Sequence, residues 1–168
     1  MARTPAAKAS PAAAMTDVEA AAVAFVQHEA RLLDDRLFDD WEALWAADGM
    51  YWIPGERDDI EAFALVQDNR NRITTRIRQM LDADRHSQRP PSRTARTVSA
   101  SQATVAEGEV VVRSSFVLLE SRLQKLVQWG GVYEHRLRVG DEGALLMALK
   151  KVLLVNRDQA LSTMAFLL

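Results

Sequence analysis

The chain has 168 residues, of which 48% are apolar, and this is enough material for one globular domain with a sizeable core. Its formal net charge of −2 provides no global attraction to the phosphate backbone of nucleic acids. The absence of cysteine excludes disulfides, thiolate nucleophiles and every iron–sulfur centre with cysteine ligands, a Rieske centre included.

The N-terminal residues 1–15 are rich in Ala and Pro and lack the apolar core of a signal peptide. We predict a flexible arm here, with simple disorder favoured over ordering by a partner, and a single domain over 16–168. The longest apolar run, Ala144 to Leu149, is far shorter than the roughly 20 residues that span a bilayer, so we expect no contact with a membrane. Without an export signal, the cytoplasm is the expected location.

The first part of the domain has helical patterns. Thr16 and Glu19 have the spacing of a capping box, and the apolar residues that follow recur at helical intervals. A second, short helix is predicted over 38–47, with Gly49 ending it. Residues 51–53 are then predicted to form a strand.

A third helix is predicted near residue 70. Residues 61–66 fit either a short strand or the approach to this helix, and Asp68 is a plausible N-cap. Ile73, Ile77 and Leu81 would form its buried face, while its arginines are expected to meet water.

The second half of the chain is predicted to be a meander of long strands over 93–106, 109–121, 124–139 and 144–156. Helices followed by such strands indicate an α+β domain, in which the helices pack on one face of a curved, mostly antiparallel sheet. The last strand is apolar on both faces, and a strand of this kind is covered on both faces. Either another subunit or the apolar residues 165–168 could cover the second face, and we favour another subunit.

The candidate catalytic residues do not form a local motif. His28, His86 and His135 lack the spacing of a metal site, so metal binding is not expected. The adjacent aspartates at 34–35, 39–40 and 58–59 do not face each other on a helix, and capping or solvation explains them better than acid–base catalysis.

A pocket inside the cone is the alternative. Asp35, Tyr51, Tyr133 and His135 are the residues that could line it. Such a pocket would serve a stand-alone isomerase or dehydratase without a cofactor, or a module that binds a small ligand. An inward His135 is, however, more typical of a satisfied core histidine.

The segment 86–96 (HSQRPPSRTAR) is the most distinctive in the chain. Two prolines stiffen it, and arginines project permanently charged, forked donors from it. Since no aromatic residues interleave with these arginines, a nucleic-acid interface is disfavoured. Pairing with carboxylates of a protein partner is the better hypothesis, beside the alternative of a solvated loop.

Several short segments occur together in one order. They are 29–36 (EARLLDDR), 41–45 (WEALW), 48–54 (DGMYWIP), 90–94 (PPSRT), 112–116 (VRSSF), 133–136 (YEHR) and 150–152 (KKV). In this order, the chain resembles the small (beta) subunit of aromatic-ring-hydroxylating dioxygenases from about residue 23 to its last residue. Ser99-Ala100 departs from the family, whose members often carry Ser-Asn there, so one polar contact would be lost.

The resemblance implies a nuclear transport factor 2-like cone and a non-catalytic subunit without a cofactor of its own. It also implies an alpha subunit that carries a Rieske [2Fe–2S] cluster and a mononuclear Fe(II), in an α3β3 hexamer with a trimer of beta subunits. Electrons would come from NAD(P)H through separate components, and O2 would be added to an aromatic ring as a cis-dihydrodiol. We assign contacts with a partner to Arg89, Pro90, Pro91, Arg93 and Arg96.

Overall fold

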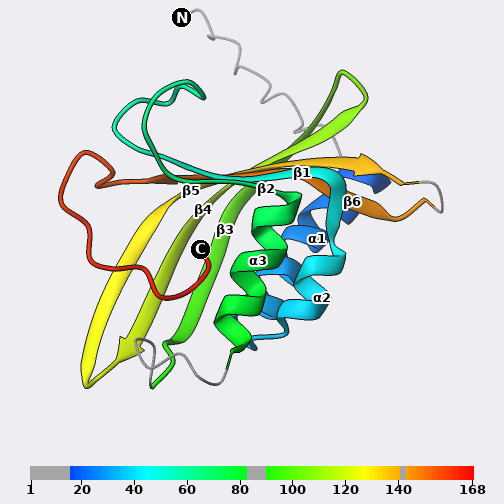
Figure 1. Ribbon diagram of the computed structural model, residues 1–168. Helices are drawn as coiled ribbons and strands as arrows, with labels where there is room; N and C mark the ends of the chain where they lie inside the picture. Colours follow the sequence, from blue (N-terminus) through cyan, green and yellow to red (C-terminus); the bar gives the residue numbers. More distant parts are fainter. Residues whose placement is uncertain (1–15, 83–89, 141–142) are drawn as a thin grey trace, which may run out of the picture.

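The computed structural model describes residues 16–82, 90–140 and 143–168 (Figure 1). The predicted arm over 1–15 lies outside these residues, as do Arg89 and His86. The elements in chain order are α1 (Asp17–Asp34), α2 (Phe38–Ala43), β1 (Trp45–Pro54), β2 (Ala64–Asn69), α3 (Arg70–Leu81), β3 (Arg93–Ala106), β4 (Glu109–Arg122), β5 (Lys125–Val139) and β6 (Leu145–Leu154).

The strands form one six-stranded sheet in the order β2-β1-β6-β5-β4-β3. Strands β1 and β6 pair in parallel, whereas the other neighbours in this sheet are antiparallel. The long strands curve around the three helices, which lie on the same side of the sheet (Figure 1). This arrangement confirms the predicted α+β cone.

Helix α1 begins where the capping box predicts. The Thr16 side chain accepts a hydrogen bond from the Glu19 backbone N–H at 3.3 Å, and the Glu19 carboxylate accepts one from the Thr16 N–H at 2.7 Å. Its apolar face, which includes Phe25, Leu32 and Leu33, is buried against the sheet. Local sequence signals therefore indicate where this helix begins and which of its faces is buried.

The predicted second helix over 38–47 is wrong in its last residues, because α2 ends at Ala43 and strand β1 starts at Trp45. Trp45 pairs with Met147 of β6, and the Met147 N–H donates to the Leu44 carbonyl at 2.7 Å. Gly49 does not end a helix. It lies where the β1–β6 register shifts, and a Cβ there would come within 2.7 Å of the Trp45 ring.

Helix α3 is capped by Asn69 instead of Asp68. The Asn69 side chain accepts from the Arg72 N–H at 3.1 Å, whereas Asp68 lies near the end of β2 as a buried carboxylate. Asp68 pairs with Arg76 at 2.5 Å and with Arg72 at 3.1 Å. Ile73 and Ile77 are buried as predicted, but Leu81 is exposed.

The four predicted strand runs of the second half are confirmed within two residues at each boundary. Ala100 lies in β3 at a register shift with φ of +50°, a left-handed conformation in which Asn is enriched. The segment after β6 brings Ala165, Leu167 and Leu168 into the core. On the other face of β6, Leu149 and Leu153 stay half-buried, and their cover by a second subunit remains a prediction.

Candidate functional site

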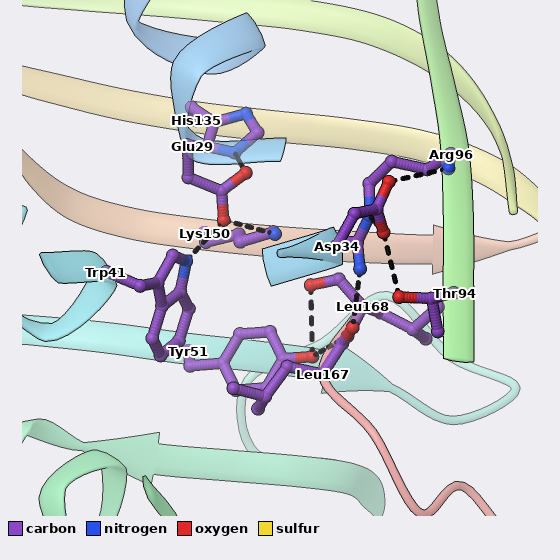
Figure 2. A network of polar contacts seen from close by, with 10 residues as sticks. All are labelled: Glu29, Asp34, Trp41, Tyr51, Thr94, Arg96, His135, Lys150, Leu167 and Leu168. Carbon is purple, nitrogen blue, oxygen red and sulfur yellow. Dashed lines mark hydrogen bonds and ion pairs between the residues drawn. The ribbon is translucent and has the colours of Figure 1, made fainter. Parts of the chain in front are cut away.

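A group of charged and aromatic side chains lies inside the cone (Figure 2). Three of the four residues predicted to line a pocket, Tyr51 of β1 and Tyr133 and His135 of β5, are buried there. Asp35 is not part of this group, which corrects its assignment to the pocket. It is the exposed C-cap of α1, and the preceding residue, Asp34, is the aspartate that turns inward.

An ion pair between Glu29 and Lys150 is at the centre of the group. Both side chains have no exposed surface, and Lys150 Nζ lies 2.6 Å from Glu29 Oε1. The same carboxylate oxygen accepts a hydrogen bond from Trp41 Nε1 at 2.5 Å. The pair joins α1 to β6, and Trp41 adds α2, so it ties three elements together inside the cone.

His135 and Tyr133 extend this ion pair along β5. The Nε2 atom of His135 lies 3.8 Å from Glu29 Oε2, and the His135 ring contacts the Tyr133 ring edge-on with centroids 5.7 Å apart. Tyr133 stacks on Phe116 at 3.9 Å and receives the Lys150 ammonium over its ring at 4.7 Å. The Tyr133 hydroxyl and both nitrogens of His135 are buried without a hydrogen-bond partner among the residues that the structure describes.

Burial and the neighbouring charges together determine the protonation states in this group. Burial alone would raise the pKa of Glu29, but Lys150 and His135 hold this pKa well below its usual value. Burial lowers the pKa of Lys150 to about 8 against the opposing effect of Glu29, and it also lowers the pKa of His135. It raises the pKa of Tyr133 far above its ordinary value. At neutral pH the group therefore contains an ion pair, a neutral imidazole and a neutral phenol.

A second ion pair, between Asp34 and Arg96, joins α1 to β3. The Arg96 side chain is 1% exposed, and its Nε lies 2.8 Å from Asp34 Oδ1. Asp34 also accepts from the Arg96 N–H at 2.7 Å and from the Thr94 hydroxyl at 2.8 Å. Arg96 Nη2 donates to the Leu167 carbonyl at 3.1 Å, so this arginine also anchors the last segment of the chain (Figure 2).

These contacts give Arg96 an internal role. Its guanidinium lies between α1 and β3 and binds Asp34 and Leu167, so it is not presented to a partner in this fold. Tyr51 has a similar role at the same place, because its hydroxyl accepts from the Leu168 N–H at 3.1 Å. Both side chains therefore fasten the segment 165–168 over the interior.

The arrangement suits stability better than catalysis. A general acid or base needs a pKa near the working pH and access to substrate, whereas Tyr133 is far from titrating and His135 has no exposed surface. Within residues 16–82, 90–140 and 143–168, no group of three or more His, Asp or Glu side chains could hold a metal ion. The burial of Tyr133 and His135 therefore does not favour a stand-alone isomerase or dehydratase.

Of the predicted partner residues, the structure places Pro90, Pro91 and Arg93 at the surface, all of them exposed. The Pro90 carbonyl accepts from Arg122 Nε at 3.1 Å. The neighbouring Ser92 is buried and donates to Glu120 at 2.6 Å. Two hydrogen bonds, from Arg122 and to Glu120, thus attach residues 90–92 to β4. The contacts of Pro90, Pro91 and Arg93 with a partner remain a prediction.

Sequence reasoning missed Glu29 and Lys150 as members of the interior. A signal for Glu29 was present, since it lies four residues after Phe25 and four before Leu33, on the buried face of the first helix. For Lys150 the signal was its place in a strand that is otherwise apolar on both faces. When one small domain buries both an acidic and a basic side chain, the two are expected to pair, because an unpaired buried charge is strongly unfavourable.

None of the helices that the structure describes is long and apolar enough to cross a membrane. A family model described as ring hydroxylating beta subunit matches residues 28–159. The chain is 28% identical over 152 residues to the benzene 1,2-dioxygenase subunit beta of Pseudomonas putida, in a match that covers 82% of this chain and 81% of the relative. It is 29% identical over 153 residues to the biphenyl 2,3-dioxygenase subunit beta of Rhodococcus jostii, with 82% and 81% covered.

The fold has a solved counterpart. The beta subunit of the benzoate 1,2-dioxygenase of Burkholderia mallei superposes with a TM-score of 0.70 at 27% identity, over 85% of this chain and 93% of that one. The sequence match and the fold match thus cover most of the same domain. The chain therefore belongs to the ring-hydroxylating beta subunits, the small, non-catalytic subunits of aromatic-ring dioxygenases.

Proposed function

We propose that this chain is the assembly subunit of a Rieske non-haem iron dioxygenase that adds O2 to an aromatic compound and forms a cis-dihydrodiol. The match of the family model over residues 28–159 carries this proposal. In the proposed complex, an alpha subunit holds a Rieske [2Fe–2S] cluster and a mononuclear Fe(II). Electrons arrive from NAD(P)H through separate proteins, and three alpha and three beta subunits form a cytoplasmic hexamer.

The interior of the cone supports an assembly role. One oxygen of the buried Glu29 carboxylate is bound by both Lys150 and Trp41, so this acid is held in place between α1, α2 and β6. The charged pairs and the segment 165–168 fill the interior with groups that stabilise the domain. What the chain offers to other molecules is therefore its outer surface, on a single domain proposed over 16–168.

The substrate is proposed only as an aromatic ring. Three of the relatives are named for benzene, biphenyl and benzoate dioxygenases. These substrates share a ring but differ in size and charge. Since no residue of this chain is proposed to touch the substrate, the choice among such rings belongs to the alpha subunit.

Arg93, with Pro90 and Pro91, is proposed to contact a neighbouring subunit. Its guanidinium is exposed at the start of β3, on a loop that Arg122 and Ser92 hold in place. A fixed backbone reduces the entropy that an interface residue loses on binding. Arginine is also one of the residue types that most often contribute a large share of the binding energy at protein interfaces.

The test is coexpression of the chain with the alpha subunit of its own dioxygenase, followed by sedimentation velocity and a visible absorption spectrum. We expect an equimolar complex with Rieske-type absorption. Arg93→Ala should weaken the complex about tenfold or more, with a change in unfolding free energy within about 0.5 kcal/mol.

Arg57→Ala is the matched control, because Arg57 is also exposed but lies in the loop between β1 and β2, far from β3 in the strand order of the sheet (Figure 1). It should leave the complex unchanged. A colourless homo-oligomer that ignores the alpha subunit would overturn the assembly function. An intact complex with Arg93→Ala would remove only the role of that arginine.

A further inference from the structure

The turn between β4 and β5 has an unfavourable backbone. Leu123 and Gln124 both have positive φ, +49° and +60°, between the paired residues Arg122 and Lys125. The turn between β3 and β4 has the same form, but there the second residue is Gly108, with φ of +80°. Glycine adopts this conformation readily, whereas leucine and glutamine do so against steric repulsion. The β4–β5 turn therefore has Leu123 and Gln124 at two positions whose backbone conformation favours Asn and Gly.

The side chains kept at this turn are apolar and exposed. Leu123 is 61% exposed and Leu126 is 69% exposed. Neither takes part in the core of the cone. Strained backbone in a native protein points to a local function that outweighs the strain, and an exposed leucine at the strained position points to binding.

The turn lies beside the proline loop. The Arg122 side chain donates to the Pro90 carbonyl, and Arg93 begins β3 directly opposite Ser121 of β4. Both segments are at the lower end of the sheet in Figure 1. The exposed leucines of the turn and the exposed residues of the loop therefore form one continuous surface.

A groove of about 230 Å³ opens next to the leucines. It lies between the β4–β5 hairpin and the segment after β6, and its walls include Leu123, Lys125, Val127 and Thr163. Among its lining residues in the described part of the chain, Glu120 is the one acid, and this carboxylate already accepts hydrogen bonds from Ser92 and Trp129. The surface beside the groove thus carries the exposed cations Lys125 and Arg93, although the chain as a whole is acidic.

We call the following residues the tip surface: Pro90, Pro91, Arg93, Leu123, Lys125 and Leu126. We propose that the tip surface binds an acidic segment of the alpha subunit, whose apolar side chains cover the two leucines. The positive charge selects an acidic occupant, and the leucines and the groove select an apolar one. This inference rests on the proposed function, because it takes the alpha subunit as the partner.

The test uses variants that do not disturb the fold. Leu123→Asn places a residue that tolerates positive φ at the strained position, so the isolated chain should be as stable as the native one or more so. Titration with the alpha subunit should nevertheless show at least a tenfold loss of affinity for Leu123→Asn/Leu126→Ser. Lys125→Glu should slow association and reduce its dependence on salt.

The matched control is Val105→Ser. Val105 is 60% exposed and lies two residues before the β3–β4 turn, as an apolar residue at the other hairpin. It should bind the alpha subunit like the native chain. Equal affinity of the double leucine variant and the native chain would overturn the inference.

Two further outcomes identify where a failure lies. If the native chain forms no complex with the alpha subunit, the proposed function fails, and the inference fails with it. If the leucine variant loses only self-association and still binds the alpha subunit fully, the surface belongs to a second copy of this chain, which also overturns the inference. Sedimentation of each variant alone and with the alpha subunit separates these cases.

Discussion

The Glu29–Lys150 pair provides a sharp test of how the interior is held together. Both groups are fully buried, and the ammonium lies 2.6 Å from the carboxylate. Lys150→Met keeps the approximate length and volume of the side chain but leaves the Glu29 carboxylate buried without this cation. Loss of one partner from a buried pair destabilises by about 3–5 kcal/mol, because the remaining charge lacks both water and a counter-ion.

The double variant Glu29→Gln/Lys150→Met should recover most of this loss. The amide oxygen of the introduced glutamine would still accept from Trp41 Nε1, and neither charge of the pair is left in the interior. Neutral groups of similar volume often replace a buried ion pair with little loss, so we expect the double variant within about 1–2 kcal/mol of the native chain. Each single variant is expected to be the less stable protein, although it changes fewer atoms.

Urea unfolding followed by the fluorescence of the four tryptophans measures the cycle, with all variants at one protein concentration. At an m-value of about 2 kcal/mol per molar, each single variant should lower the midpoint by about 2 M. The coupling free energy of the cycle should exceed about 3 kcal/mol. Additive effects, with a coupling below about 1 kcal/mol, would refute the view that the two charges depend on each other.

Three further predictions concern the same interior and the sheet. Arg96→Met should lower the free energy of unfolding by about 2–4 kcal/mol, because it leaves the Asp34 carboxylate without its counter-ion. A loss under about 0.5 kcal/mol would contradict the internal role of Arg96. Folding lowers the pKa of His135 from its ordinary 6.5 and the pKa of Glu29 from its ordinary 4.5. Below each ordinary value the unfolded chain therefore binds a proton that the native chain does not bind. The free energy of unfolding must then fall as the pH drops through 6.5 and again through 4.5. Between about pH 7 and pH 5.5, the urea midpoint of His135→Gln should therefore decline less than the midpoint of the native chain. If both midpoints declined in parallel, His135 would not be the source of the pH dependence. Ala100→Gly relieves a left-handed alanine and should raise the unfolding free energy by about 1 kcal/mol, which an unchanged midpoint would disprove.

Patterns within a few residues determined much of this protein. The capping box at Thr16, the helical repeat of α1 and the four strand runs of the second half are all local, and the structure confirms them. The ordered short segments between 29 and 152 also identified the family. The helix start, the helical repeat and the strand runs could be read from the sequence because each depends on neighbours within one turn or one strand, whereas the family came from the resemblance of the ordered segments.

Only the tertiary structure decided which charges turn inward. Trp45 left the predicted helix because it pairs with Met147 in β6, and Asp34 replaced Asp35 in the interior because of the position of β3. Glu29 and Lys150 are 121 residues apart in the chain, yet they form the central ion pair. A single sequence carries propensity and spacing, but the partner of a buried charge is set by which strands the sheet brings against α1.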